Sequence, residues 1–183
     1  MGYDKKGSVM VLVVVVIAAV TVVASLMLSI AMSQFRIRKS NSELRKAFYL
    51  SEDGLNRTYS KIYDLMCAAV EASQSIADEY LTDNPEDIEM AEAIFENSYK
   101  RHMLDNISGC ISRQNPYTEI TNRTKLAFMN GKLTIRVGST YISESGTKKH
   151  TSADIIVCIP SYTEVKSGTA EPERKINYAG FDL

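Results

Sequence analysis

The sequence lacks the residue patterns that most enzymes and metal sites require. It has only two histidines and three cysteines, and neither His102 nor His150 stands at a spacing that would hold zinc together with a cysteine. It contains no G-x-S-x-G segment, P-loop, dinucleotide fingerprint or H-E-x-x-H pair. Nucleophilic, phosphoryl-transfer and metal chemistry therefore lack their usual motifs. We predict that the chain is not an enzyme and uses no cofactor or metal.

Internal repeats and strongly basic segments are also missing. No segment recurs at a fixed period, and 183 residues are enough for one globular domain and an anchor. The net charge is -1, and no stretch is basic enough to indicate a nucleic-acid partner. The acidic residues of 86–96 lack the loop spacing that calcium coordination requires, so we interpret them as a solvated helix face.

The apolar residues are concentrated near the N-terminus. No residue from Val9 to Met32 carries a charge, and the next charged residue is Arg36. A helix of that length spans roughly 36 Å, against about 30 Å for the hydrocarbon core of a bilayer. We predict a transmembrane helix over residues 8–34. A cleavable secretory signal is an alternative, but its apolar region usually covers only about 7 to 15 residues.

The residues before this helix read M-G-Y-D-K-K-G, with Lys5, Lys6 and Gly7 directly ahead of Ser8. This segment, residues 1–7, resembles the leader of type IV prepilins. The resemblance implies that the glycine lets the backbone extend into a peptidase and that the lysines hold the segment on an anionic inner surface. In that family a membrane peptidase cuts after a glycine that follows basic residues and methylates the new N-terminus. The resemblance implies cleavage between Gly7 and Ser8.

The flanking charges leave the orientation open. Arg36, Arg38 and Lys39 outnumber Lys5 and Lys6, and by themselves they favour the opposite orientation across the membrane. The second interpretation of this segment is a plain signal anchor in which Lys5 and Lys6 are ordinary flanking charges.

A second similarity follows the apolar helix. Residues 47–55 read A-F-Y-L-S-E-D-G-L, which is similar to the A-F-x-x-A-E-x-G-L pattern of minor pilins of the PilX type. The matching residues are Ala47, Phe48, Glu52, Gly54 and Leu55. Ser51 stands where the family more often has alanine. The resemblance covers residues 1–60 and implies a minor pilin or pseudopilin, a structural subunit of a type IV pilus or of a related secretion or DNA-uptake filament.

One position departs from the major-pilin pattern. Most pilins have glutamate as the fifth residue after the cut, where it compensates the charged N-terminus of a neighbouring subunit; here that residue is Leu12. A carboxylate in an apolar bundle is costly unless it is paired. The K-type pseudopilin of type II secretion similarly lacks the glutamate and caps the tip. Leu12 therefore favours a tip or priming position, or a family that dispenses with the residue.

The resemblance also implies partners and a location. The partners are the prepilin peptidase, an inner-membrane assembly platform, membrane lipid before assembly, and other pilin subunits that contact the apolar helix. The protein would be a single-pass protein of the cytoplasmic membrane with its C-terminal domain outside the cytoplasm, and would reach a filament or the cell surface after assembly. The alternative is a signal-anchored protein whose extracytoplasmic domain binds or senses a ligand.

Helical periodicity continues past the apolar segment. Apolar residues recur at spacings of three, four or seven, which indicates an amphipathic helix over 35–82. They are Leu44, Phe48, Leu55, Tyr59, Ile62, Met66, Ala69, Ile76 and Tyr80. Gly54 costs this helix about 1 kcal/mol relative to alanine and would suit a bend. Small polar residues recur every fourth position at Thr21, Ser25, Ser29 and Ser33; they either pack against neighbouring helices or bond back to their own carbonyls.

Residues 83–183 form the predicted distal domain. Asn84 suits a helix cap and Pro85 a first helical position, so we expect a second, short helix from Pro85 to Asn106. Its predicted apolar face consists of Ile88, Ala91, Ile94, Phe95, Met103 and Leu104.

Strand patterns follow the second helix. Asn130-Gly131 between 125–129 and 132–137 predicts a type I′ hairpin, with Leu126 and Phe128 on the same face as Leu133, Ile135 and Val137. Further strands are expected over 154–159, after a polar turn at 144–150, and over 175–181. The fold class is thus α+β: a long N-terminal helix, a second short helix and a small antiparallel sheet.

The cysteines leave two alternatives open. Three cysteines cannot all pair within one chain, and Cys110 and Cys158 both lie in the distal domain. A disulfide between them would clip that domain in an oxidising compartment. Buried free thiols are the other alternative, because free cysteine packs as a small hydrophobe.

Overall fold

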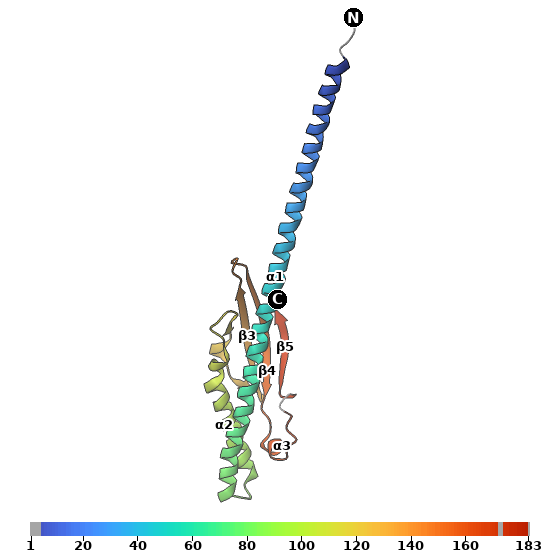
Figure 1. Cartoon of the computed structure of the whole chain (residues 1–183). Coiled ribbons are helices and arrows are strands. Elements are labelled where there is room, and N and C mark those ends of the chain that lie inside the picture. Colours follow the sequence, from blue (N-terminus) through green and yellow to red (C-terminus); the bar gives the residue numbers. More distant parts are fainter. Residues whose placement is uncertain (1–4, 172–173, 183) are drawn as a thin grey trace. The chain divides into compact units, whose positions relative to one another are not determined.

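The computed structural model describes residues 5–171 and 174–182 of the chain. Contacts divide the chain into two compact units, Met1–Leu44 and Arg45–Leu183, and we call the second unit the head. Helix α1 (Lys5–Asp83) belongs to both. In the head, α1 and helix α2 (Ile88–Asn106) cover one face of an antiparallel sheet (Figure 1). The predicted α+β class, with a long first helix, a second helix and a small sheet, is confirmed.

Within the head, α1 buries one face against the sheet, and α1 continues through Gly54 as a single helix. The buried residues recur every three or four positions and include several small and hydroxylated ones. They are Ala47, Ser51, Gly54, Leu55, Thr58, Ile62, Met66, Ala69, Ser73 and Ala77. Leu44 and Ile76, predicted on this face, are each 47% exposed. The prediction followed the large apolar residues, whereas the closest packing selects small ones.

Helix α2 begins later than the sequence suggested. Asp87 is the N-cap, and its carboxylate accepts from the Met90 N–H at 3.1 Å. Asn84 instead ends α1, because its own N–H donates to the Tyr80 carbonyl, and Pro85 lies in the turn between the helices. The predicted cap at Asn84 and first position at Pro85 are therefore wrong.

The buried face of α2 is also narrower than predicted. It consists of Ala91, Phe95, Tyr99 and Met103, which recur every fourth residue. Ile88 is 54% exposed and Leu104 is exposed as well. Tyr99, absent from the predicted face, is fully buried.

The sheet has five antiparallel strands in the order β1-β3-β4-β5, with β2 paired to β3 beside β1. The strands are β1 (Tyr117–Ile120), β2 (Phe128–Met129), β3 (Lys132–Ile142), β4 (Lys148–Cys158) and β5 (Ile176–Asp182). The sequence patterns predicted the regions of β2 to β5 but missed β1.

The predicted hairpin is confirmed in its turn and register. Asn130 and Gly131 both have positive φ angles, 51° and 72°, as a type I′ turn requires. Phe128 pairs with Leu133, so the expected faces agree. Its first strand is shorter than predicted, because residues 123–125 form a 3-10 turn.

Strand β4 begins six residues before the predicted start. The turn that precedes it covers only residues 143–147, and Lys148 already pairs with Ile142. Residues 148–153 alternate between outward polar side chains and the buried Thr151 and Ala153. The strand was not predicted here because most of these residues are polar and the inward side chains, Thr151 and Ala153, are small.

The outer edge of β3 is covered along most of its length. Strand β1 pairs with Val137–Thr140. Beyond each end of β1, an asparagine amide takes the place of a backbone neighbour. Asn115 bonds the Ile142 backbone through both side-chain atoms, at 2.6 and 3.1 Å. Asn122 bonds the Thr134 carbonyl at 2.8 Å and the Arg136 N–H at 2.9 Å.

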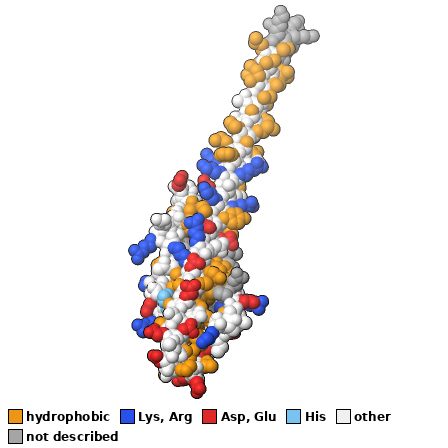
Figure 2. Space-filling view, turned by 60° about the horizontal axis from the view of Figure 1, so that its bottom comes forward, with side chains coloured by type: hydrophobic (Ala, Val, Ile, Leu, Met, Phe, Trp, Pro, Cys, Tyr) orange, Lys and Arg blue, Asp and Glu red, His pale blue; other side chains and the backbone are white. Residues whose placement is uncertain are grey.

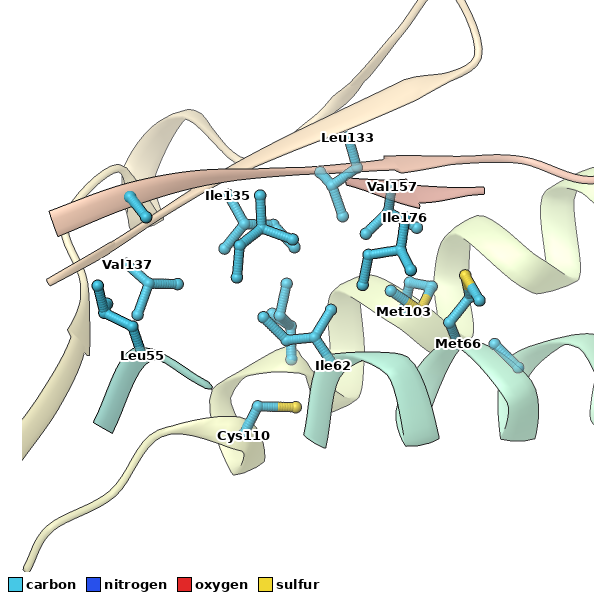
Figure 3. Close-up of a cluster of buried hydrophobic side chains, with 14 of the residues drawn as sticks. Leu55, Ile62, Met66, Met103, Cys110, Leu133, Ile135, Val137, Val157 and Ile176 are labelled. Atoms are coloured by element: carbon cyan, nitrogen blue, oxygen red, sulfur yellow. The ribbon is translucent and has the colours of Figure 1, made fainter. Parts of the chain in front are cut away.

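The main core lies between the sheet and the two helices (Figure 3). Leu55 of α1 lies beside Val137 of β3, Ile62 lies below Ile135, and Met66 lies beside Met103 of α2. A second cluster joins the far end of α1 to α2 and to α3 (Tyr162–Lys166), a short helix that follows β4. It consists of Ala77, Ala91, Phe95 and Tyr162.

Candidate functional site

The first unit of the chain contains one helix segment that is long and apolar enough to span a membrane. Its apolar window has a mean hydropathy of 3.1, and none of the window is buried inside the protein. The large apolar side chains from Val9 to Ile37 are exposed, and Figure 2 shows them covering the N-terminal part of the chain. Such a surface is stable only in an apolar environment.

The residues of the predicted cleavage site lie at the start of α1. Met1–Asp4 fall outside the described residues, and α1 begins at Lys5. The backbones of Lys6, Gly7 and Ser8 are helical, while the side chains up to Ser8 also fall outside the description. Leu12 is exposed on the apolar surface, where it can meet lipid or another helix.

Two members of the small polar strip bond back to their own helix. The Thr21 hydroxyl donates to the Ile17 carbonyl at 2.8 Å, and Ser25 donates to the Thr21 carbonyl at 2.8 Å. These bonds give both hydroxyl protons an acceptor within the helix, which an apolar environment would not supply. Of the two alternatives given for the small polar residues, Thr21 and Ser25 show the bond back to a carbonyl of their own helix.

Residues 47–55 lie in the first turns of the head. Ala47 and Leu55 are fully buried, Phe48 and Glu52 are half-buried, and Gly54 faces the sheet. A Cβ atom on Gly54 would overlap Ser139 Oγ and would lie 3.0 Å from the Pro116 ring. The glycine is therefore explained by a close approach between helix and sheet rather than by a bend.

Hydroxyl groups join α1 to the sheet on both sides of Gly54, in a set that sequence reasoning missed. The Thr151 hydroxyl of β4 donates to Ser51 at 3.2 Å, and Thr58 Oγ1 lies 3.2 Å from Thr118 Oγ1 of β1. Each of these four side chains is buried. We call Ser51, Gly54 and Thr58, with the facing Thr118, Ser139 and Thr151, the helix–sheet seam. The three- and four-residue spacing of its α1 members was the available signal.

Two tyrosines connect the last strand to α1. Tyr59 and Tyr178 stack with ring centroids 4.6 Å apart, the Tyr59 hydroxyl donates to the Ile176 carbonyl, and the Tyr178 hydroxyl donates to Asn56. Burial, aided by the nearby Tyr59, raises the pKa of Tyr178 to about 12. The phenol therefore stays protonated and serves as a hydrogen-bond donor.

Cys67, Cys110 and Cys158 are unpaired in the structure, and Cys67 and Cys158 are half-buried. Cys110 is buried, and its Sγ lies 3.6 Å from the Lys61 carbonyl. Burial raises the pKa of this thiol, which disfavours the reactive thiolate. Among the described residues, no three His, Cys, Asp or Glu side chains are grouped as metal ligands.

A groove of about 540 Å³ lies between α1 and α2. It is lined by Ile76 and Ile94 together with polar residues, including Ser98, His102 and Asp105. Within the described part of the chain no hydrogen bond joins Ser98 to His102.

Comparisons with protein-family models, with curated proteins and with solved structures found no match to this chain. The candidate functional features are therefore taken from the sequence and the structure of this chain alone. They are an uncovered apolar helix at the N-terminus and a head whose first turns are locked to the sheet by the helix–sheet seam.

Proposed function

We propose that this chain is a minor pilin or pseudopilin, a structural subunit that waits in the cytoplasmic membrane and is extracted into a filament. The observation that carries the proposal is the apolar helix of the first unit. Its window is entirely uncovered by the rest of the protein, so it requires partners that this chain does not supply. Lipid can supply them before assembly, and the helices of other subunits after it. Both environments are dry and apolar, which allows one helix to use each in turn.

The helix–sheet seam gives additional support. The segment that resembles minor pilins places Gly54 against Ser139 and Pro116, which accounts physically for a glycine in the middle of a helix. The neighbouring Ala47 and Leu55 are fully buried under the sheet. The segment thus couples the long helix to the head, as a subunit pulled through its helix would require.

Leader processing tests the proposal. The full-length chain is expressed with and without a prepilin peptidase, and the mature N-terminus is determined by mass spectrometry. We expect methylated Ser8 at the N-terminus only when the peptidase is present. Gly7→Leu should abolish the cut, because a bulky side chain replaces the small residue at the site. Gly2→Leu, elsewhere in the same segment, is the matched control and should be cut normally.

A different result would favour the other interpretation of the apolar helix. The charges of Arg36, Arg38 and Lys39 exceed those of Lys5 and Lys6 and by themselves favour the opposite orientation across the membrane. An N-terminus at Met1 or Gly2 in peptidase-positive cells would contradict the pilin proposal. It would leave a single-pass protein with a binding or sensing domain.

A further inference from the structure

One end of the head carries a group of exposed basic side chains drawn from two distant parts of the sequence. Arg45 and Lys46 stand at the first turn of α1 within the head, and Lys148 and Lys149 begin β4. Arg45, Lys46 and Lys148 are exposed, and Lys149 is half-buried. We call these four residues the basic end.

Two contacts bring these segments together. The Lys149 ammonium lies 5.8 Å from the centre of the Phe48 ring. Two residues further along β4 and three further along α1, the Thr151 hydroxyl donates to Ser51 at 3.2 Å. Strand β4 therefore begins beside the start of the head's helix and runs in the same direction. The four basic residues share the end of the head from which the chain continues into the apolar helix.

Exposed apolar and aromatic side chains accompany the basic ones. Tyr49 is 65% exposed and packs edge-on against Phe48, with ring centroids 5.7 Å apart. Ile142, paired with Lys148 across the β3–β4 hairpin, is 40% exposed. Tyrosines beside lysines whose aliphatic stems lie along apolar surface are typical of the membrane–water interface.

The opposite end of the head has the opposite charge. The turn between α1 and α2 carries Asp83, Glu86, Asp87 and Glu89, all of them exposed, and Figure 2 shows acidic side chains gathered at this tip. At the basic end, Glu144 of the β3–β4 turn is an exposed acidic residue. The head is thus polarised along its length, and an anionic surface would attract one end and repel the other.

We propose that the basic end is a docking surface for the anionic lipid headgroups of the membrane that holds the apolar helix. Arg45, Lys46, Lys148 and Lys149 contact the phosphates, and Tyr49 and Ile142 enter the interfacial layer. The proposal rests on membrane insertion of the helix and not on leader removal, so it and the pilin proposal can fail separately.

The docking surface implies a mechanical consequence for a membrane-held protein. A head held by its basic end presents its acidic tip away from the bilayer. The head is released from this surface when the protein leaves the anionic lipid or when salt screens the electrostatic attraction. At 0.1 M ionic strength this attraction falls off within a Debye length of about 10 Å.

The test uses the reactivity of native lysines in the full chain. The protein is placed in nanodiscs of phosphatidylcholine or of an equal mixture with phosphatidylglycerol, acetylated with an N-hydroxysuccinimide ester, and analysed by peptide mass spectrometry. Lys148 and Lys149 should react at least about threefold more slowly in the anionic discs at about 0.1 M ionic strength. A surface potential near -30 mV alone reduces the deprotonated amine by about that factor. High salt should remove the difference.

Lys132 provides an internal control on the same strand pair. It is exposed, and it stands at the other end of β3 from Ile142. The separation is about 33 Å at a rise of about 3.3 Å per residue, which is about three Debye lengths at 0.1 M ionic strength. Its reactivity should not depend on the lipid. Equal rates at Lys148 in both kinds of disc, or equal slowing at Lys132, would overturn the proposal.

Charge-neutralised variants separate docking from simple proximity to the bilayer. Arg45→Gln combined with Lys46→Gln leaves Lys148 and Lys149 in place as reporters, and their protection in anionic discs should fall to less than half of the original slowing. Lys132→Gln, the matched control, should keep the full protection. Circular dichroism of each variant verifies the fold.

Protection that rises with protein concentration and is the same in both lipids would instead identify a second copy of the chain as the occupant, and would refute lipid docking.

Discussion

Gly54 of α1 lies so close to Ser139 of β3 that a single added methyl group would overlap the serine hydroxyl. Glycine in a helix interior is unfavourable on propensity alone. Its presence here is explained by the approach of the helix to the sheet, which the Pro116 ring limits from a second side at 3.0 Å. The contact lies in the middle of the helix–sheet seam.

Gly54→Ala should destabilise the head although alanine is the better helix former. Propensity favours alanine by about 1 kcal/mol, whereas overpacking a closed site typically costs about 1 to 3 kcal/mol. We expect a net loss of about 1 kcal/mol in the free energy of unfolding, measured by urea titration in mild detergent with circular dichroism. Gly109→Ala is the control and should not destabilise, since no atom lies within 4 Å of its added Cβ.

The same site allows a double-mutant test. Ser139 Oγ is buried, with no hydrogen-bond partner among the described residues, so Ser139→Ala alone should be nearly neutral or slightly stabilising. Combined with Gly54→Ala, it should recover part of the loss, because the nearest overlap is removed while Pro116 remains. A Gly54→Ala variant as stable as the parent protein would contradict the packing explanation.

Ser73→Ala should stabilise the head. Ser73 is fully buried on α1, and within the described chain its hydroxyl has no hydrogen-bond partner. The substitution removes an unsatisfied polar atom and improves helix propensity, so we expect a gain of about 1 kcal/mol in the free energy of unfolding. Ser51→Ala is the informative comparison, because that variant loses the bond from Thr151 and should be less stable. A loss of stability in Ser73→Ala would refute this explanation.

The ion pair between Arg136 and Asp154 should make part of the stability dependent on pH. Arg136 donates two hydrogen bonds to the Asp154 carboxylate, at 2.7 and 2.8 Å, and they hold the pKa of Asp154 below its usual range. A lowered pKa in the folded state contributes stability above the unfolded pKa of about 3.9 and loses it as the pH falls through the folded pKa.

Asp154→Asn measures this contribution. The pair lies on the solvent face of the sheet, so its loss should cost about 0.5 kcal/mol at neutral pH. The difference from the parent protein should vanish in acid, once Asp154 is protonated in both states. Unfolding by urea at a series of pH values checks this. A difference that persists undiminished at the most acid pH would show that the substitution acts through packing.

Leu12→Glu tests the proposed tip or priming position. If the lack of a carboxylate at this position confines the subunit to filament ends, the added glutamate should let the subunit appear along the filament. Immunogold labelling of the two forms measures the distribution, and Val13→Glu, one position along, is the control. Labelling confined to the ends for both forms would remove the charge argument.

Much of the fold follows from local signals. The helical period fixes α1, and Asn130 with Gly131 fixes the hairpin because few residue pairs accept two positive φ angles. These features depend on residues close together in the sequence. The apolar character of the first helix is similarly local and needs no tertiary information.

The helix–sheet seam could not be predicted in the same way. Ser51 and Thr151 are separated by 100 positions in the sequence, and neither hydroxyl carries a hydrophobic signal. Strand β1 was missed because its only fully buried side chain is Thr118, a hydroxyl. The basic end also depends on a tertiary contact, since nothing local connects Lys149 to Phe48. Where the buried side chains are polar or small, a periodic pattern of apolar residues identifies only some of the buried positions.

The two asparagines beside β1 have a consequence for contacts between copies of the chain. An open strand edge recruits a second chain into a continuous sheet when copies are held at high local concentration. Asn115 and Asn122 occupy the backbone groups of β3 with side-chain amides, which cannot propagate a ladder. On that side the sheet ends in strands of four and two residues, which leaves little open backbone there for a neighbouring chain to join.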